Sequence, residues 1–308
     1  MSNVFTIIVT YNSMKWINKC LENLHESSIH TEIVVVDNCS TDETISFIKL
    51  NYPKVHIIVN NKNVGFGQAN NIGIEYAYHK GATNFFLCNQ DLYINEKTLE
   101  ELLNVQEQYN VDIVSPMQLN GEFSALDGGF YFDISSHQNF RKFVSDLYTR
   151  KLDYYYYVDF VPAAAWMINK STIEKIGGFD PIFFHYGEDY HYSRRLLYHK
   201  MKMAIVPSSR VGHDRIFKGN IDAFNKYSPL AILTNAYADP NDPILVPTFK
   251  RIKANLIIIR NIFKALFALN FKKFSSLSSS YFVFLKKLNN IAKSVRCNRK
   301  IDSNWLNL

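Results

Sequence analysis

The runs VFTIIVT at residues 4–10 and EIVVVD at residues 32–37 decide the fold of this chain. Both are nearly continuous apolar runs rich in β-branched residues, which is typical of strands buried on both faces of a sheet. Between them, residues 13–26 place apolar side chains at helical spacing. A strand, a helix and a second strand in this order predict a unit with two parallel strands.

The alternation of strand and helix patterns continues after the second run. Two more strands are expected at residues 55–60 and 84–88, with a helix at residues 68–79 between them. Another helix is expected to start at Ser40, with Ser40 as its N-cap and Glu43 as the partner in a capping box. The series predicts an α/β fold, in which a Rossmann-like, mostly parallel sheet is flanked by helices.

The middle of the chain is less regular. Residues 120–160 are rich in aromatic residues and turn formers, so they fit an edge strand, a core-facing hairpin or an insertion that borders a sugar site. Beyond them, a strand followed by a helix is expected at residues 162–175, a helix at residues 188–199 and a short strand at residues 204–207.

The cysteines and the hydropathy pattern favour a reducing compartment. The four cysteines are scattered without paired spacing, so they are expected to be free thiols. With 47% apolar residues, the chain can bury a sizeable core. No signal peptide is visible before the first strand, and no apolar run reaches the ~18 residues that span a bilayer. We therefore expect the protein in the cytoplasm.

Positive charge is concentrated toward the C-terminus. Residues 250–300 hold 13 Lys and Arg and no Asp or Glu, whereas residues 1–249 carry a balance of −6. The stretch 237–247 contains three prolines. It predicts a boundary between a catalytic domain of residues 1–236 and a basic helical extension of residues 237–308.

Apolar residues recur at helical spacing at the start of this extension, at positions 252, 256, 259, 263 and 266. An amphipathic helix with flanking Lys and Arg fits an anionic membrane surface as its partner. A helical cap packed on the catalytic domain, or an oligomer contact, would show the same pattern. No recognition motif accompanies the charge, so nucleic acid is not an expected partner.

Polar residues follow each of the first four predicted strands. Because ligands bind at the carboxyl ends of strands in open α/β sheets, these strand ends are expected to form a site. The chain has no glycine fingerprint after its first strand and no Walker loop, so side chains would hold a nucleotide. The residues are Thr10 and Asn12, Asp37 and Asn38, Asn63 and Gly65, and Asn89 and Asp91.

Five motifs, in order, resemble the inverting family 2 glycosyltransferases, which have the GT-A fold. The third motif is especially similar to the rhamnosyltransferase branch that builds bacterial surface polysaccharides. The resemblance covers roughly residues 3–215. The motifs are VTYN at 9–12, VVVDNCSTD at 34–42, NNKNVGFGQANNIGI at 60–74, GGFDPIFFHYGEDYHYSRRL at 177–196 and VPSSRVGH at 206–213.

The resemblance implies a nucleotide diphospho-sugar as the donor. Asp37 is placed to accept hydrogen bonds from the base or the ribose. Asn63, Gly65 and the start of the helix at 68–79 could meet the phosphates, since a helix N-terminus favours anions. The donor-binding residues that it implies are Thr10, Asn12, Asp37, Asn38, Asn63, Gly65, Asn70, Asn71 and Asn89.

Two phosphates in one pocket need a counter-charge, which a divalent cation such as Mg or Mn supplies. Asp91 stands where the family carries its metal-binding acid, and His213 stands where members often supply a second ligand. Gln90 departs from the proline that the branch more usually shows at this position, which leaves the number of protein ligands open.

The acidic pair Glu188-Asp189 resembles that of the family. Asp189 is the expected general base, which takes the proton of the acceptor hydroxyl, and Glu188 orients the acceptor or supports the loop. Both acids would also fit a helix start with no catalytic role. A single base without a positioned nucleophile implies one displacement with inversion. Arg194 or Arg195 would contact the diphosphate or line the helix.

These features predict an inverting glycosyltransferase at the inner face of the cytoplasmic membrane. Its expected acceptor is a lipid-linked glycan or a saccharide in O-antigen or capsule synthesis. Rhamnose from dTDP-rhamnose is the first choice of donor, with UDP-linked galactofuranose, galactose, glucose or N-acetylglucosamine as alternatives. A catalytically silent sugar-binding or scaffold protein of the same fold is a second class. A sugar nucleotidyltransferase is a third, but the glycine-rich phosphate loop that it needs is absent.

Overall fold

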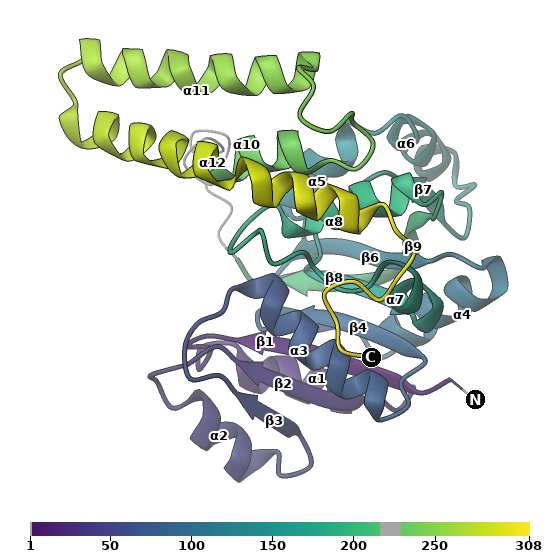
Figure 1. Cartoon of the computed structure of the whole chain (residues 1–308). Coiled ribbons are helices and arrows are strands. Elements are labelled where there is room, and N and C mark those ends of the chain that lie inside the picture. Colours follow the sequence, from purple (N-terminus) through teal and green to yellow (C-terminus); the bar gives the residue numbers. More distant parts are fainter. Residues whose placement is uncertain (1, 216–228) are drawn as a thin grey trace.

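The computed structural model describes residues 2–215 and 229–308 of the chain (Figure 1). A nine-stranded sheet is flanked by helices, and a helical hairpin projects beyond it (Figure 1). The strands are β1 (Val4–Thr10), β2 (Glu32–Asp37), β3 (His56–Val59), β4 (Asn84–Asn89), β5 (Leu92–Ile94), β6 (Ile113–Asn120), β7 (Tyr156–Val158), β8 (Ala165–Asn169) and β9 (Met203–His213). The helices of the described residues are α1 (Ile17–His25), α2 (Thr44–Asn51), α3 (Phe66–His79), α4 (Thr98–Tyr109), α5 (Gly128–Ser135), α6 (Phe140–Thr149), α7 (Lys170–Ile176), α8 (Glu188–Tyr198), α10 (Pro229–Ala238), α11 (Phe249–Phe267) and α12 (Phe271–Asn298).

The predicted parallel strands form one half of the sheet. β3, β2, β1 and β4 lie side by side in that order and are parallel. The order continues with β8, β6, β9 and β5, and β8 runs antiparallel to both β4 and β6. The expected α/β fold is therefore confirmed, and its second half is mixed, because β6 is parallel to β9 whereas β5 and β7 are antiparallel to β9.

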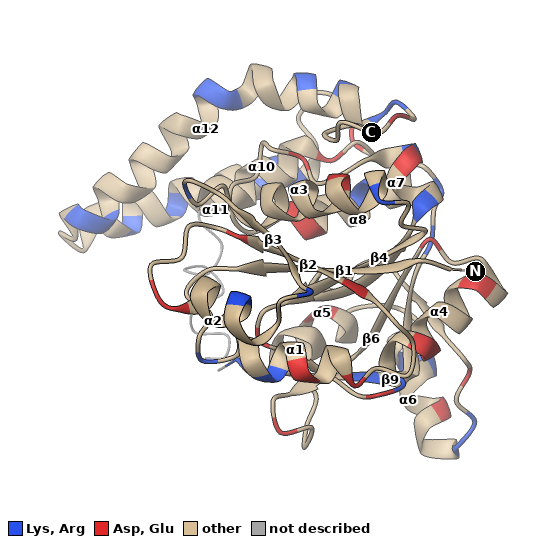
Figure 2. Ribbon diagram, turned by 90° about the horizontal axis from the view of Figure 1, so that it is seen from below, with Lys and Arg blue, Asp and Glu red and all other residues tan. Residues whose placement is uncertain are grey.

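The sheet is buried on both faces. Alternate side chains of each strand point to opposite sides and enter two separate apolar clusters. Ile7 and Phe85 belong to one apolar cluster, whereas Ile8 and Phe86 belong to the other, and all four are fully buried. α3 packs on one face, and α1 and α4 cover the opposite face (Figure 2). This double cover explains the continuous apolar runs of the central strands.

The start of the second helix differs from the prediction. α2 begins at Thr44, and Ser40 does not cap it, because the Ser40 hydroxyl donates to the carboxylate of Asp37. Glu43 makes no side-chain cap hydrogen bond, so the predicted capping box is wrong. Asp42 accepts the Thr44 N–H instead.

The aromatic stretch at residues 120–160 forms two helices and one short strand. α5 and α6 cover the end of the sheet, and β7 pairs with β9. The expected edge strand is therefore limited to Tyr156–Val158. Phe130 and Phe143 explain part of the aromatic content, because both are buried in the core.

The extension shares a third apolar cluster with α10 and with Phe183, which precedes α8. Leu233 of α10, Ile258 of α11 and Phe284 of α12 are buried in this cluster, and α11 and α12 form the projecting hairpin (Figure 1). α10 begins before residue 237, so this cluster includes residues on both sides of the predicted domain boundary. Among the described residues, no helix combines the length and the apolar character needed to cross a bilayer.

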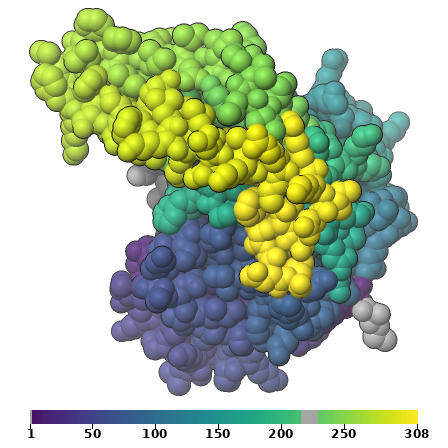
Figure 3. Space-filling view, viewed as in Figure 1, coloured from purple at the N-terminus to yellow at the C-terminus, as the bar shows by residue number. Residues whose placement is uncertain are grey.

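The chain after α12 returns to the sheet and packs against it (Figure 3). The Leu306 side chain is buried in the cluster that contains Ile7 and Phe85. The Gly178 N–H donates to the Asn304 carbonyl at 2.9 Å. The neighbouring Gly177 has φ +69, and a Cβ there would lie 1.9 Å from the same carbonyl oxygen. The C-terminal segment therefore belongs to the core of the sheet domain.

We predict that Leu306→Ala lowers the free energy of unfolding by about 2–4 kcal/mol, because it leaves a cavity in a packed core. Ile301→Ala is the matched control, since Ile301 lies in the same segment and is 73% exposed. It should change the free energy by less than about 0.5 kcal/mol. Urea denaturation followed by circular dichroism measures both variants, and equal values for the two would contradict this packing.

Candidate active site

The polar ends of three strands meet at one edge of the sheet. Thr10 of β1 lies opposite Asp37 of β2, and Val9 lies opposite Asn89 of β4. The site residues that follow these strands are therefore neighbours, as the sequence predicts. β3 also ends here, since the Asn60 N–H donates to the Asp37 carbonyl.

Asp37 is the centre of a hydrogen-bond network at this edge. Its side chain is 1% exposed and accepts hydrogen bonds from the Thr10 hydroxyl at 2.9 Å and from the Ser40 N–H at 2.9 Å. Asn12 lies beside it with φ +51, and its side-chain oxygen accepts the Thr41 N–H at 2.8 Å. The structure thus brings Thr10, Asn12 and Asp37 together in a fixed arrangement.

Asn38 fixes the loop that leads into α3. Its amide nitrogen donates to the Gly65 carbonyl, and its amide oxygen accepts from Asn60 at 3.0 Å. Asn63 accepts the Gly65 N–H at 2.9 Å. Gly65 has φ +87, and a Cβ there would lie 2.0 Å from the Phe184 carbonyl oxygen. Only a glycine at position 65 therefore lets the loop that contains Phe184, before α8, pack against the loop that leads into α3.

Asn70 and Asn71 are buried, with 1% and 3% of their surface exposed. The Asn70 amide donates to the Phe66 carbonyl, within α3. The Asn71 amide bonds both the N–H and the carbonyl of Phe179 and donates to the Trp305 carbonyl. Both side chains hold protein segments together, and neither lines the cavities described below.

Asp91 and His213 form the pair that the sequence predicts. His213 ends β9 and is 1% exposed, and its Nε2 lies 3.4 Å from Asp91 Oδ1. The other ring nitrogen of His213 is buried without a hydrogen-bond partner. Two cis ligands of one Mg²⁺-like cation would lie about 3 Å apart, so this pair fits such a cation.

In the described part of the chain, no group of three or more His, Cys, Asp or Glu side chains gathers at one point. Any cation at Asp91 and His213 would therefore take its remaining oxygen ligands from phosphate or water. Gln90 has another task, since its side chain accepts the Tyr11 N–H at 2.8 Å. It ties the turn that carries Asp91 to the end of β1.

A cavity of about 160 Å³ lies between this edge and the start of α8. Asn89 lies at its β4 side, and the acidic pair Glu188-Asp189 lies at its α8 side. The Asn89 N–H donates to the Ala164 carbonyl, and Asp189 accepts the Ala163 N–H at 3.4 Å. One short segment before β8 thus positions both sides of the cavity.

Glu188 is buried, and its Oε2 atom has no hydrogen-bond partner among the described residues. Burial, followed by the charge of Asp189, raises the pKa of Glu188 to about 8. Glu188 is therefore mainly protonated near neutral pH.

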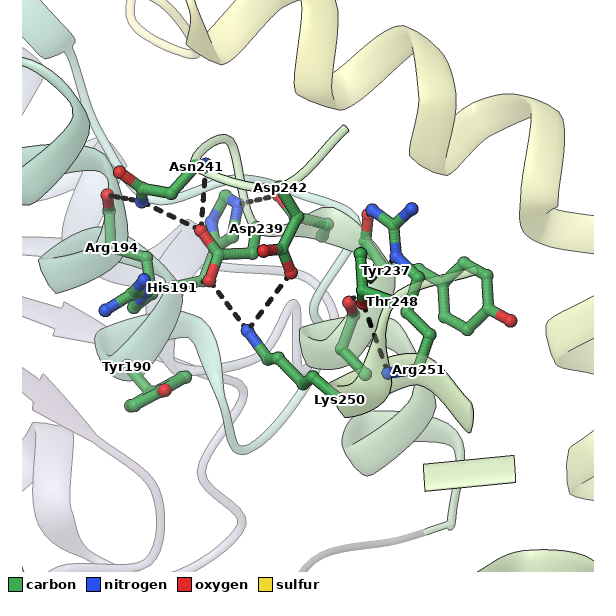
Figure 4. Close-up of polar contacts among 12 residues, drawn as sticks. Tyr190, His191, Arg194, Tyr237, Asp239, Asn241, Asp242, Thr248, Lys250 and Arg251 are labelled. Carbon is green, nitrogen blue, oxygen red and sulfur yellow. Dashed lines mark hydrogen bonds and ion pairs between the residues drawn. The ribbon is translucent and has the colours of Figure 1, made fainter. Parts of the chain in front are cut away.

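The inward face of α8 is anchored below the cavity. Arg195 is fully buried and donates to the Gly178 carbonyl, so it lines the helix and does not reach a diphosphate. His191 bonds the Ala238 carbonyl through Nε2, and burial lowers the pKa of His191 to about 4. Arg194 donates instead to Asp239, at the end of α10 (Figure 4).

Arg215 and Asp127 are site residues that the sequence reasoning missed. Arg215 lines the cavity, and two of its nitrogens donate to the Asp127 carboxylate. This ion pair joins the segment after His213 to the start of α5. The two residues are 88 positions apart, so no local pattern could have linked them.

Two known glycosyltransferases are similar to this chain in sequence. The dTDP-rhamnosyl transferase RfbF of Shigella flexneri is 27% identical over 215 residues, which cover 69% of each chain. The low-salt glycan biosynthesis hexosyltransferase Agl10 of Haloferax volcanii is 28% identical over 203 residues, 63% of this chain and 62% of that one.

Solved structures share the fold at lower identity. Residues 1–349 of S. aureus TarS, solved with UDP, align over 76% of this chain and 63% of that chain, with 15% identity and a TM-score of 0.54. GalNAc-T7, solved with UDP, GalNAc and Mn²⁺, aligns over 76% and 47%, with 18% identity and a TM-score of 0.56. These likenesses confirm the predicted GT-A type of fold.

The family is shown by a sequence profile. The profile of glycosyl transferase family 2 matches residues 6–177, more than half of the chain. The matched segment contains the strand ends, Asp91 and the segment before β8. Together with the shared fold and the polar cavity at the strand ends, this match identifies the chain as a member of glycosyl transferase family 2.

Proposed function

We propose that this chain transfers a sugar from a nucleoside diphosphate sugar to an acceptor hydroxyl, with inversion at the anomeric carbon. The observation that carries the proposal is the cavity with Asn89 at the strand ends on one side and Asp189 on the other. A donor with its nucleotide at Asp37 and Asn12 would extend its sugar toward Asp189. The neighbours of the same fold that were solved with UDP support a nucleotide as part of the donor.

Asp189 acts as the base in this proposal. Its carboxylate takes the proton of the acceptor hydroxyl while that oxygen attacks the anomeric carbon, and the nucleoside diphosphate leaves with the bonding electrons. Glu188 stays protonated beside it and therefore adds no second negative charge next to the base. The Ala163 N–H holds the base in place.

Asp91 and His213 Nε2 would hold a divalent cation, which the 3.4 Å between that nitrogen and Asp91 Oδ1 permits. When bound, the cation neutralises charge on the two phosphates as the bond to the sugar breaks. Thr10, Asn12, Asp37, Asn38, Asn63 and Gly65 shape the nucleotide end, and Asn89 lies between the nucleotide and the sugar.

Rhamnose from dTDP-rhamnose is the proposed donor, which the likeness to the Shigella dTDP-rhamnosyl transferase supports. The proposed acceptor is a lipid-linked glycan of a surface polysaccharide. The extension would bring it to the site from an anionic membrane. Its α11 stripe supports this, since Leu256, Phe263 and Phe267 are 61%, 53% and 82% exposed beside Lys and Arg (Figure 2).

We expect Asp189→Asn to lower kcat by at least about 100-fold, because the general base is lost, while nucleotide binding is retained. Asp91→Asn should instead abolish the Mn²⁺-dependent increase in nucleotide affinity. Nucleoside diphosphate release from a panel of nucleotide sugars measures the first effect, and thermal shift with dTDP and UDP measures the second. Glu26→Gln is the control, since Glu26 is an exposed acid just after α1. Release of no nucleoside diphosphate from any sugar, with or without chelator, would instead indicate a silent protein.

The raised pKa of Glu188 predicts a pH-dependent stability difference. Between its ordinary value of 4.5 and about 8, native Glu188 keeps a proton that the unfolded chain releases. The wild type therefore loses stability as pH rises through this window, and Glu188→Gln does not share the loss. The Tm of the variant relative to wild type should be a few degrees higher at pH 8 than at pH 5. A pH-independent difference would show that the pKa of Glu188 is not raised in the folded protein.

The membrane proposal predicts that Phe263→Ser with Phe267→Ser weakens binding to phosphatidylglycerol vesicles by at least about tenfold, because two large apolar side chains leave the lipid interface. Tyr148→Ser on α6 is the matched control, since Tyr148 is 91% exposed away from the extension. Vesicle co-sedimentation measures both. Retention of full vesicle binding by the double variant would exclude this face as the membrane contact.

A further inference from the structure

A second, larger cavity of about 910 Å³ adjoins the first. The two share Asp133, Phe160, Gly187 and Asp189 in their walls, so the proposed base faces both. The larger cavity extends from Asp189 to α11, between the α5–α6 segment and α10. Its volume lies within the usual range for a small-molecule site.

One wall of this cavity is basic. Arg194 of α8 and Lys250 and Lys253 of α11 line it. Arg194 Nε and Lys250 Nζ both donate to Asp239 Oδ2, at 2.8 and 2.6 Å (Figure 4). This shared acceptor places the guanidinium and the ammonium side by side on two different helices.

Asp239 fixes the positions of these two cations. It is 1% exposed, and although burial favours its neutral form, the hydrogen bond and charge of Lys250 lower the pKa of Asp239 to about 2. The Asp242 carboxylate also lies 3.8 Å from the Lys250 ammonium and offsets part of the positive charge of the pair Arg194 and Lys250. Lys253 makes no hydrogen bond or ion pair with another described residue. Arg194 donates to Asp239 through Nε, and its two terminal nitrogens donate to no described residue. This wall therefore keeps cationic donors available to a ligand.

Acids and aromatic rings line another part of the cavity. Asp159 and Asp189 can accept hydrogen bonds from hydroxyl groups, and Phe160 and Tyr190 stack edge to face at 5.4 Å beside them. Carboxylates beside aromatic rings suit a polyhydroxylated ligand. The charged groups of the cavity are therefore separated: acceptors for hydroxyl groups lie near the proposed base, and cations lie near α11.

We infer that this cavity binds the acceptor, and that the acceptor is a saccharide joined to a phosphate group, with the sugar at Asp189 and the phosphate at Lys253, Lys250 and Arg194. The inference rests on the proposed function and adds the substrate class of the same site. The phosphate would lie on the helix whose outer face carries the exposed Leu256, so a lipid linked through it could continue toward the membrane side.

The test compares glucose 1-phosphate with methyl glucoside, which lacks the phosphate, on protein saturated with UDP and Mn²⁺. Isothermal titration calorimetry should give glucose 1-phosphate at least about tenfold tighter binding, because charge-assisted hydrogen bonds are added. Lys253→Gln should remove most of this preference. Lys264→Gln is the matched control, since Lys264 is an exposed lysine of α11 outside the cavity, and it should bind as the wild type does.

Inorganic phosphate is the third probe, because it separates a sugar phosphate site from a plain anion site. Weaker binding of inorganic phosphate than of glucose 1-phosphate supports the inference, and equal binding overturns its saccharide part. Equal affinity for the two sugars, no detectable binding of glucose 1-phosphate, or identical behaviour of Lys253→Gln and Lys264→Gln would overturn the phosphate part. The assay needs no turnover, so these outcomes are separate from a failure to release nucleoside diphosphate.

Discussion

The parallel register of β1 with β2 and β4 is the constraint on which the site depends. It places Thr10 opposite Asp37 and brings Asn89 to the same level, so polar side chains from three strands share one edge. A slip of one residue would move a whole strand's side chains to the wrong face. Because both faces are closely packed, that slip would disrupt the side-chain packing on both of them and move Thr10 away from Asp37, so the register is fixed.

The extension is joined to the catalytic helix rather than appended to it. Asp239 joins Arg194 of α8 to Lys250 of α11, and His191 bonds the carbonyl of Ala238. A buried carboxylate is stable only when its partners offset the lost hydration, and here the partners come from different segments. Movement of the hairpin would therefore disturb the helix that begins with the acidic pair.

The sequence predicted the parallel half of the sheet and the polar strand ends that share one edge of it, because strand periodicity and polar strand ends are local signals. The pairing of Asp91 with His213 was predicted only through the family resemblance, since their contact depends on the fold of distant segments. Ser40 was misassigned as a cap because the pattern does not show that Asp37 competes for its hydroxyl. The cations of the larger cavity were not recognised as one group, because Arg194 and Lys250 meet only through a buried acid on a third segment.

The packing of Leu306 into the cluster around Ile7 has a consequence for biosynthesis. The first strand leaves the ribosome long before residue 306 is translated, so this part of the catalytic core stays open while α11 and α12 are being made. During that interval an incomplete apolar surface and the exposed face of the hairpin coexist on one nascent chain. Early contact of the hairpin with a lipid surface would keep it from associating with the unfinished core.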